Sequence, residues 1–168
     1  MTRMRAILAL AMMLFAGAAS AAYDANGVAL DATEKAVLQQ FPSAYCQALQ
    51  WTSRAADRRC DDSRVVIGGV MGRITFYLKK DRVQAFDVRV DSKDADQLAA
   101  FLKKRYGTPS GETRDKFEKG DKRGTGELYK VHWEKDGERA VLTSLTEKRR
   151  AVLTVSRGDF EEEIYRVR

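Results

Sequence analysis

The sequence predicts an α+β fold: an antiparallel sheet with helices packed on one face. Apolar and polar residues alternate through 74–78, 86–90 and 129–133, which is the period of a half-buried strand. Residues 95–102 instead place alanine and leucine at helical spacing. Because strands that follow one another without intervening helices pair antiparallel, this order favours helices on an antiparallel sheet over alternating parallel units.

The first 21 residues are typical of a cleavable secretory signal peptide. Arg3 and Arg5 precede an apolar run, residues 6–16, and residues 19–21 fit a cleavage site. The run is about half as long as the roughly 20 residues of a membrane-spanning helix; an uncleaved anchor is the alternative. No cysteine follows it, as a lipoprotein signal would require. We expect residues 22–168 to form a single domain, periplasmic or secreted, without membrane insertion.

The charge of the chain indicates which class of molecule it is expected to bind. The chain has 30 basic and 24 acidic residues, and loss of Arg3 and Arg5 would lower its formal net charge from +6 to +4. The two signs are interspersed, which is not the pattern of a nucleic-acid-binding surface. We therefore expect a protein or an anionic envelope component as partner, and no nucleic acid.

Two cysteines, Cys46 and Cys60, predict one disulfide. In an oxidising compartment a single pair most simply forms a bond, and only one pairing exists. Closing a loop of about 15 residues should stabilise the fold by roughly 3 kcal/mol, because it lowers the chain entropy of the unfolded state. The alternative, a redox-active dithiol, lacks the C-x-x-C spacing.

The first half of the chain is expected to hold one short helix and three strands. Asp31 and Glu34 have capping-box spacing, and Pro42 interrupts the helix that follows them. Residues 43–51 are expected to add a helical turn or two, and residues 54–63 to form a polar loop tied back by the disulfide. The three strands comprise residues 65–67, 74–78 and 86–90.

The second half repeats this order of elements. Asp91 caps a helix that ends near Gly107. A polar loop with an irregular strand near Phe117 follows, and Asp136-Gly137 predicts a hairpin. The remaining elements are strands at 129–133, 140–145 and 151–155, and a short closing helix, or an edge strand, at 159–166.

This order indicates an internal duplication, 31–90 and 91–156. A helix opening near Asp31, cysteines around a polar loop, and the strand 74–78 resemble one unit of the helix-plus-meander repeat proteins of the bacterial envelope. That family includes beta-lactamase inhibitory protein and the small outer-membrane-assembly lipoproteins. Residues 102–109 are similar to a pattern in Gram-negative envelope proteins. The resemblance implies a binding or scaffolding role rather than an enzyme, and it carries over no inhibitory residue.

The sequence gives little support to a catalytic or metal site. His132 is the only histidine and is expected on the solvent face of its strand, opposite Val131. With both cysteines oxidised, neither a Cys/His nucleophile pair nor a zinc site of several Cys and His ligands can form. We predict no cofactor, no metal and no enzymatic activity. The remaining acidic groups are interpreted as a loop pair, Asp61 and Asp62, and as helix caps, Asp91, Asp94 and Asp96.

Basic residues form three short clusters, each of which also has a local explanation as solvated charge at a turn or helix end. Residues 148–150 form one of them, in a predicted turn. The two proposed for anion binding comprise Arg54, Arg58 and Arg59 and, at a helix end, Lys103, Lys104 and Arg105. If the fold brings two clusters together, they would hold a lipid head group, a lipopolysaccharide phosphate or an acidic protein.

Tyr77 and Tyr129 are expected to be exposed or half-exposed and to anchor an interface, with completion of the core as the alternative. The sequence thus predicts an exported, non-catalytic binding or scaffolding protein of the bacterial periplasm. Two alternatives stay open: a small envelope hydrolase with two converging carboxylates, and an inhibitor or immunity protein against a secreted enzyme.

Overall fold

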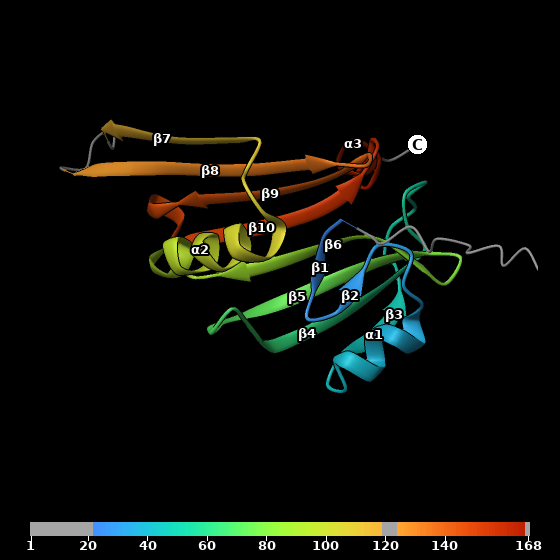
Figure 1. The fold of residues 1–168 in the computed structure, drawn as a ribbon. Helices are drawn as coiled ribbons and strands as arrows, with labels where there is room; N and C mark the ends of the chain where they lie inside the picture. Colours follow the sequence, from blue (N-terminus) through green and yellow to red (C-terminus); the bar gives the residue numbers. More distant parts are fainter. Residues whose placement is uncertain (1–21, 119–123, 167–168) are drawn as a thin grey trace, which may run out of the picture.

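The computed structural model describes residues 22–118 and 124–166. The signal peptide predicted at 1–21 lies outside these described residues. Within them, eight strands form one antiparallel sheet in the order β3-β4-β5-β6-β10-β9-β8-β7 (Figure 1), so the predicted α+β class with an antiparallel sheet is confirmed. The strands are β3 (Tyr45–Ala48), β4 (Arg58–Ile67), β5 (Val70–Lys79), β6 (Arg82–Val90), β7 (Gly111–Glu118), β8 (Thr125–Lys135), β9 (Glu138–Leu145) and β10 (Arg150–Arg157).

The chain runs through this sheet as two four-strand meanders that meet in the middle. α1 (Glu34–Gln40) precedes β3 to β6, and α2 (Ala95–Tyr106) precedes β7 to β10. β6 and β10 pair antiparallel, with Val88 opposite Leu153, and so join the two meanders into one sheet. β3 and β7 form its two edges.

One face of the sheet carries α1, α2 and the main core. Val37 of α1 and Leu98 of α2 are fully buried in the same cluster as Phe76 and Leu153 of the central strands. In Figure 1, α2 lies across the middle of the sheet, near β6 and β10. A short hairpin packs on the same core and consists of β1 (Asp24–Ala25) and β2 (Val28–Ala29).

The short helix α3 (Phe160–Glu163) packs on the opposite face, which corrects the expectation that all helices share one face. Phe160 packs against Tyr77 and Ala85, and the ring centroids of Tyr77 and Phe160 are 5.5 Å apart. Because successive residues of a strand point to opposite faces, Tyr77 faces away from the core that holds Phe76. The one-face arrangement is therefore true of α1 and α2 only.

The first half contributes one strand more than predicted to the main sheet, besides the β1-β2 hairpin, which was not predicted. Residues 45–48, expected to be helical, form β3, and β4 begins within the expected loop, so Asp61 and Asp62 are strand residues. α1 also starts later than expected. Thr33 accepts a hydrogen bond from the N–H of Ala36, whereas Asp31, the predicted cap, has a positive φ of 67°.

The second half follows its prediction more closely. The side chain of Asp91 accepts a hydrogen bond from the N–H of Lys93 at the start of a 3-10 turn, η1 (Ser92–Asp94), that leads into α2. Asp136 and Gly137 both have positive φ, as the predicted two-residue hairpin requires. β7 is a regular strand of 8 residues rather than an irregular one.

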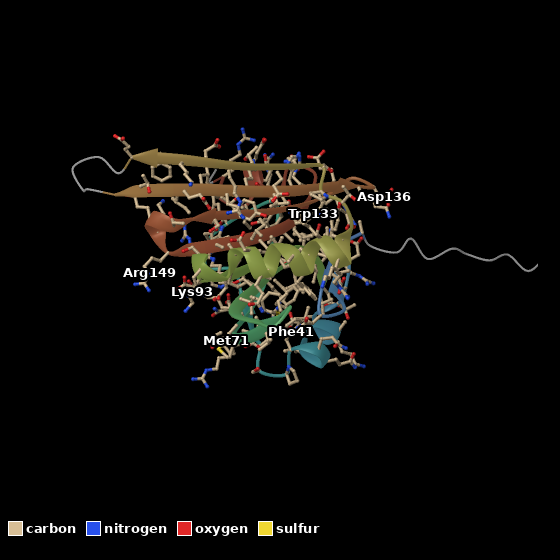
Figure 2. All side chains as sticks on the ribbon, turned by 60° about the vertical axis from the view of Figure 1, so that its left-hand side comes forward. Phe41, Met71, Lys93, Trp133, Asp136 and Arg149 are labelled. Atoms are coloured by element: carbon tan, nitrogen blue, oxygen red, sulfur yellow. A yellow bond between two sulfur atoms is a disulfide. The ribbon has the colours of Figure 1, made fainter. Side chains whose placement is uncertain are left out.

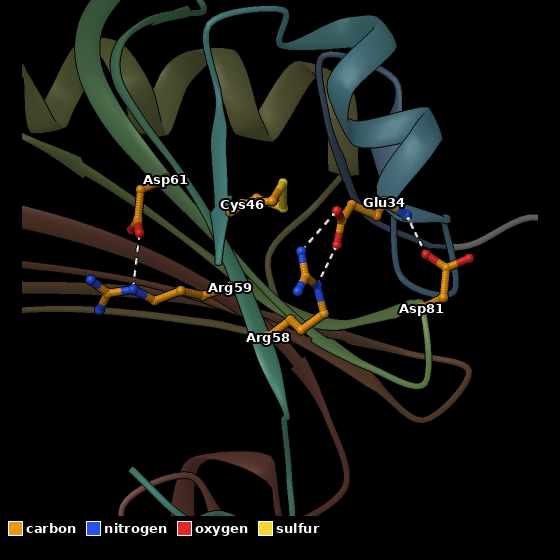
Figure 3. The surroundings of a disulfide bond; sticks show 7 residues. Glu34, Cys46, Arg58, Arg59, Asp61 and Asp81 are labelled. Atoms are coloured by element: carbon orange, nitrogen blue, oxygen red, sulfur yellow. Dashed lines mark hydrogen bonds and ion pairs between the residues drawn. A yellow bond between two sulfur atoms is a disulfide. The ribbon is translucent and has the colours of Figure 1, made fainter. Parts of the chain in front are cut away.

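A disulfide joins Cys46 and Cys60, as predicted (Figure 3). The two residues lie directly opposite each other on β3 and β4, with their Cα atoms 3.9 Å apart. The bond therefore does more than close a loop, because it fastens a four-residue edge strand to the sheet.

Replacing both cysteines, Cys46→Ala with Cys60→Ala, should lower the free energy of unfolding by roughly 3 kcal/mol, the value expected for a loop of about 15 residues. Urea denaturation of the variant and of the oxidised protein measures this difference. Reduction of the unmodified protein is the control and should give a similar loss. A difference close to zero would show that β3 is held to β4 without the bond.

Candidate binding surface

The sheet face opposite α1 and α2 is half-exposed over the second meander. Side chains on β8, β9 and β10 alternate between the buried core, which holds Leu142 and Leu153, and this other face. Their outward neighbours line a hollow of about 370 Å³. We call these half-exposed residues the open face: Leu128, Val141, Thr143, Leu145, Val152 and Thr154.

Positive charge gathers at one end of the open face. Five basic residues line a second hollow of about 540 Å³, in which Asp91 is the single acidic residue. Lys148 and Arg150 line both hollows, so the two adjoin each other. Arg149 and Asp136 lie at opposite ends of the molecule in Figure 2. We call the five residues the cation cluster: Arg73, Arg89, Lys148, Arg149 and Arg150.

Several elements of secondary structure supply the cation cluster. Arg73 on β5 and Arg89 on β6 are direct cross-strand partners, and the next residue across the sheet is Val152 on β10. Lys148 ends the 3-10 turn η2 (Thr146–Lys148), and Arg149 follows it with a φ of 48°. The arginines at 73 and 89 are thus fixed by the sheet, while the other three enter from the β9–β10 connection and the start of β10.

No carboxylate neutralises the cation cluster in the described residues, because none of its five members forms an ion pair within 4.0 Å there. Arg89 does interact electrostatically with Asp87 on the same strand, where its charge acts to lower the pKa of that carboxyl group. The cluster is therefore a local excess of positive charge on a protein that otherwise pairs many of its basic residues.

In the first of the two predicted anion-binding clusters, two of the three arginines form ion pairs with acidic residues of the same chain (Figure 3). Arg58 donates two hydrogen bonds to Glu34, at 2.7 and 3.0 Å. The Nε atom of Arg59 lies 3.0 Å from a carboxylate oxygen of Asp61. Arg54 lines a different hollow, with Lys79 and Arg157 among others.

The second predicted cluster is also mostly paired. The Nζ atom of Lys103 donates to Glu112 at 2.7 Å, and Arg105 donates to Asp24 at 2.9 Å. Lys104 is exposed on the last turn of α2. The structure instead brings the third basic cluster, 148–150, together with two arginines of the first meander. Sequence reasoning missed this combination because residues 148–150 lie more than 50 positions from Arg73 and Arg89 in the sequence.

Tyr77 and Tyr129 are not exposed, so the expectation of an exposed aromatic pair is wrong and the alternative, completion of the core, is correct. Tyr77 is 4% exposed beneath α3, and burial raises the pKa of its hydroxyl group. Tyr129 is 3% exposed, donates a hydrogen bond to Glu112 at 2.7 Å and lies under the guanidinium of Arg114. Burial, with the bond to Glu112, raises its pKa to about 12.

His132 is half-buried on the same face as Val141, opposite Val131, with its ring against Gly111. A Cβ atom on Gly111 would lie 2.3 Å from the imidazole. Among the described residues, one group has metal-ligand spacing, and it consists of Glu34, Cys46 and Cys60. Since both sulfurs are bonded to each other, this group has no thiolate to offer a metal ion.

Asp87 is the acidic group in the middle of the seam between the meanders. Its carboxylate accepts a hydrogen bond from the hydroxyl of Thr154 at 2.8 Å. Burial raises its pKa, the charge of Glu161 on α3 acts in the same direction, and the bond from Thr154 and the charge of Arg89 oppose the rise. The neutral form of Asp87 is therefore favoured relative to a solvated aspartate.

Comparison with known proteins finds no significant match to a family model, a curated protein or a solved structure. No helix in the described part of the chain combines the length and the apolar composition of a membrane span. The function must therefore be argued from the surface itself.

Replacing Asp87 by asparagine should change how stability depends on pH. A raised pKa means that the folded protein binds this proton more tightly than the unfolded chain, so the stability that Asp87 contributes is complete below its ordinary pKa of 3.8 and is lost as pH rises through the folded pKa. The asparagine introduced by Asp87→Asn has no proton to lose in this range. The free energy of unfolding of Asp87→Asn should therefore increase relative to that of the unmodified protein as pH rises above about 3.8.

Urea denaturation at a series of pH values from about 3.5 to 7 measures the difference. Asp115→Asn, on the exposed edge strand β7, is the matched control. A constant difference between Asp87→Asn and the unmodified protein over the whole range would contradict the raised pKa.

Proposed function

We propose that this chain is an exported, non-catalytic binding or scaffolding protein, and that the open face with its cation cluster holds an anionic partner. The partner is a protein or a component of the bacterial envelope. One observation carries the proposal: half-exposed aliphatic side chains and unpaired cations lie on the same face, in two adjoining hollows that share Lys148 and Arg150. Apolar surface that excludes water, beside arginines that contribute charge, is the composition of an interface.

The chemistry of the cluster suits recognition better than catalysis. Arginine stays charged at all physiological pH values and presents a planar fork of donors to oxyanions. Exposed cations also raise the rate at which an anionic partner is captured, an effect that salt screens. The surface therefore supplies affinity through its apolar part, and capture and orientation through its charges.

The order of elements supports the proposed duplication of 31–90 and 91–156. Each meander follows a helix, and the sheet order is symmetrical about the contact between β6 and β10. Such a duplication places the candidate surface where the two units meet, and it agrees with the resemblance to helix-plus-meander binding proteins. The disulfide is compatible with a periplasmic or secreted location, since such bonds persist in oxidising compartments.

One observation favours a carboxylate hydrolase as second candidate. Asp87 has a raised pKa, as a general acid needs, and Glu161 lies at the edge of the same open face. Against this, Asp87 accepts a hydrogen bond from Thr154 and is not among the residues that line the hollow, whose walls are mainly aliphatic and threonine side chains. The binding role accounts for more of the surface.

Site-specific photocrosslinking tests the proposed function. A benzophenone amino acid is placed at Thr143 on the open face or, as control, at Lys104 on α2, which lies on the other side of the sheet. In the exporting cell, one species should crosslink from position 143 and not from 104. Arg150→Glu should remove that crosslink, because it reverses a charge shared by both hollows, whereas Lys104→Glu should leave it intact. A crosslink insensitive to Arg150→Glu would contradict the proposal.

A further inference from the structure

Resting on the proposed function, we infer that the cation cluster is a phosphate site and that its ligand is a phosphorylated amphiphile. The phosphomonoester group lies between Arg73, Arg89 and Arg150, and the attached alkyl chain lies along the open face. The inference stands on three observations: a pair of like charges held opposite each other, a local excess of cations that form no ion pair in the described residues, and an apolar hollow that shares residues with the charged one.

The first observation is that two arginines occupy directly opposite positions of neighbouring strands. Arg73 and Arg89 face each other across β5 and β6, on the same side of the sheet. Like charges in directly opposite positions of an antiparallel pair are destabilising. Neither side chain has a carboxylate within ion-pair distance in the described structure. A bound anion between the two would turn this repulsion into attraction.

The amount of charge indicates the kind of anion. Five cations converge on one hollow of about 540 Å³, and the carboxylate of its single acid, Asp91, accepts the N–H of Lys93 at 3.0 Å. A carboxylate brings one negative charge, whereas a phosphomonoester brings nearly two, with three acceptor oxygens in the volume of one group. Arginine forks bind such an anion with paired hydrogen bonds. An acidic protein would need several carboxylates to converge at this point.

The neighbouring hollow indicates what the phosphate is attached to. Lys148 and Arg150 line both hollows. The apolar side chains of Leu145 and Val152 line the second hollow with them. Leu145 is the direct cross-strand partner of Arg150, and Val152 is that of Arg89. An alkyl chain that leaves a phosphate held by these arginines therefore runs over half-exposed aliphatic side chains. Burial of about 60 Å² of apolar surface is enough for a tenfold gain in affinity.

Isothermal titration of the oxidised, exported protein at about pH 7.5 tests this inference, since the phosphomonoester is then almost fully ionised. Three probes are compared: octyl phosphate, inorganic phosphate and octyl glucoside, which share either the chain or the anion. We expect octyl phosphate to bind at least about tenfold more tightly than inorganic phosphate, and octyl glucoside to show no binding. Vesicles with and without phosphatidic acid then show whether the same group is bound in a lipid surface.

Matched variants separate the two parts of the site. Arg73→Gln with Arg150→Gln should weaken octyl phosphate and inorganic phosphate alike, whereas Lys35→Gln with Lys104→Gln, an equal loss of charge at exposed positions of α1 and α2, should change neither. Val152→Thr keeps the side-chain shape and should weaken octyl phosphate alone. Because Arg73→Gln removes repulsion in the free protein, it should leave the unfolding midpoint in urea unchanged or higher, which separates lost binding from lost folding.

Each other outcome overturns the inference. Equal binding of octyl phosphate and octyl glucoside would mean an apolar site without a phosphate site. Equal binding of octyl phosphate and inorganic phosphate would mean that the chain makes no contact. If no phosphorylated probe binds while the crosslink from position 143 persists and depends on Arg150, the phosphate inference fails and the binding function stands. If that crosslink is also absent, both fail.

Discussion

The antiparallel ladder between β6 and β10 is the interaction on which the rest of the structure depends. It pairs residues 85–90 with residues 151–156, across more than 60 positions of sequence. Such a contact costs more loop-closure entropy than pairing between neighbouring strands, because a longer segment of chain must be closed. In return, two small sheets become one, and Val37 of α1 and Leu98 of α2 enter a single core that neither meander could form alone.

The same ladder creates the candidate binding surface. It sets Arg89 beside Val152 and Asp87 beside Thr154, so charge from the first meander meets apolar surface from the second. The two meanders also differ on this face. α3 and Trp51 cover Tyr77 and Ala85 of the first, while Val141 and Val152 of the second stay half-exposed. This face is therefore covered near α3, and its accessible part comprises the second half and the contact between the meanders.

The predictability of each element follows from the range of the interactions that form it. α2 and the hairpin at Asp136-Gly137 depend on caps, helical spacing and turn residues, which are local, and both are present as expected. β3 and the start of β4 depend on the disulfide and on pairing with β5, and their own residues have little apolar alternation. The local sequence therefore predicts a loop at the polar stretch before Cys60, where the structure has the start of a strand.

The burial of Tyr77 could not be derived from its strand either. The alternation correctly places it away from Phe76, but only the return of α3 from the end of the chain decides that this second face is covered there. The same limit applies to the cation cluster. Arg73 and Arg89 are recognisable as outward-facing residues, and 148–150 as a basic turn, yet nothing local says that they meet.

The cation cluster differs from many other basic residues of the described chain, because those residues form ion pairs with carboxylates. Arg58, Arg105 and Arg157 each bind a carboxylate supplied by a distant segment, which shows that acids are available to pair with outward-facing arginines. Exposed pairs of this kind contribute little to stability, so their main effect is to remove excess charge from the surface. At the contact between the meanders no such pairing is made by Arg89 or Arg150 in the described residues. The strand positions opposite these two arginines hold Val152 and Leu145 rather than acidic residues. The fold thus leaves positive charge unpaired where it adjoins the half-exposed apolar surface of the open face, and an anionic, partly apolar ligand would satisfy both parts of that arrangement at once.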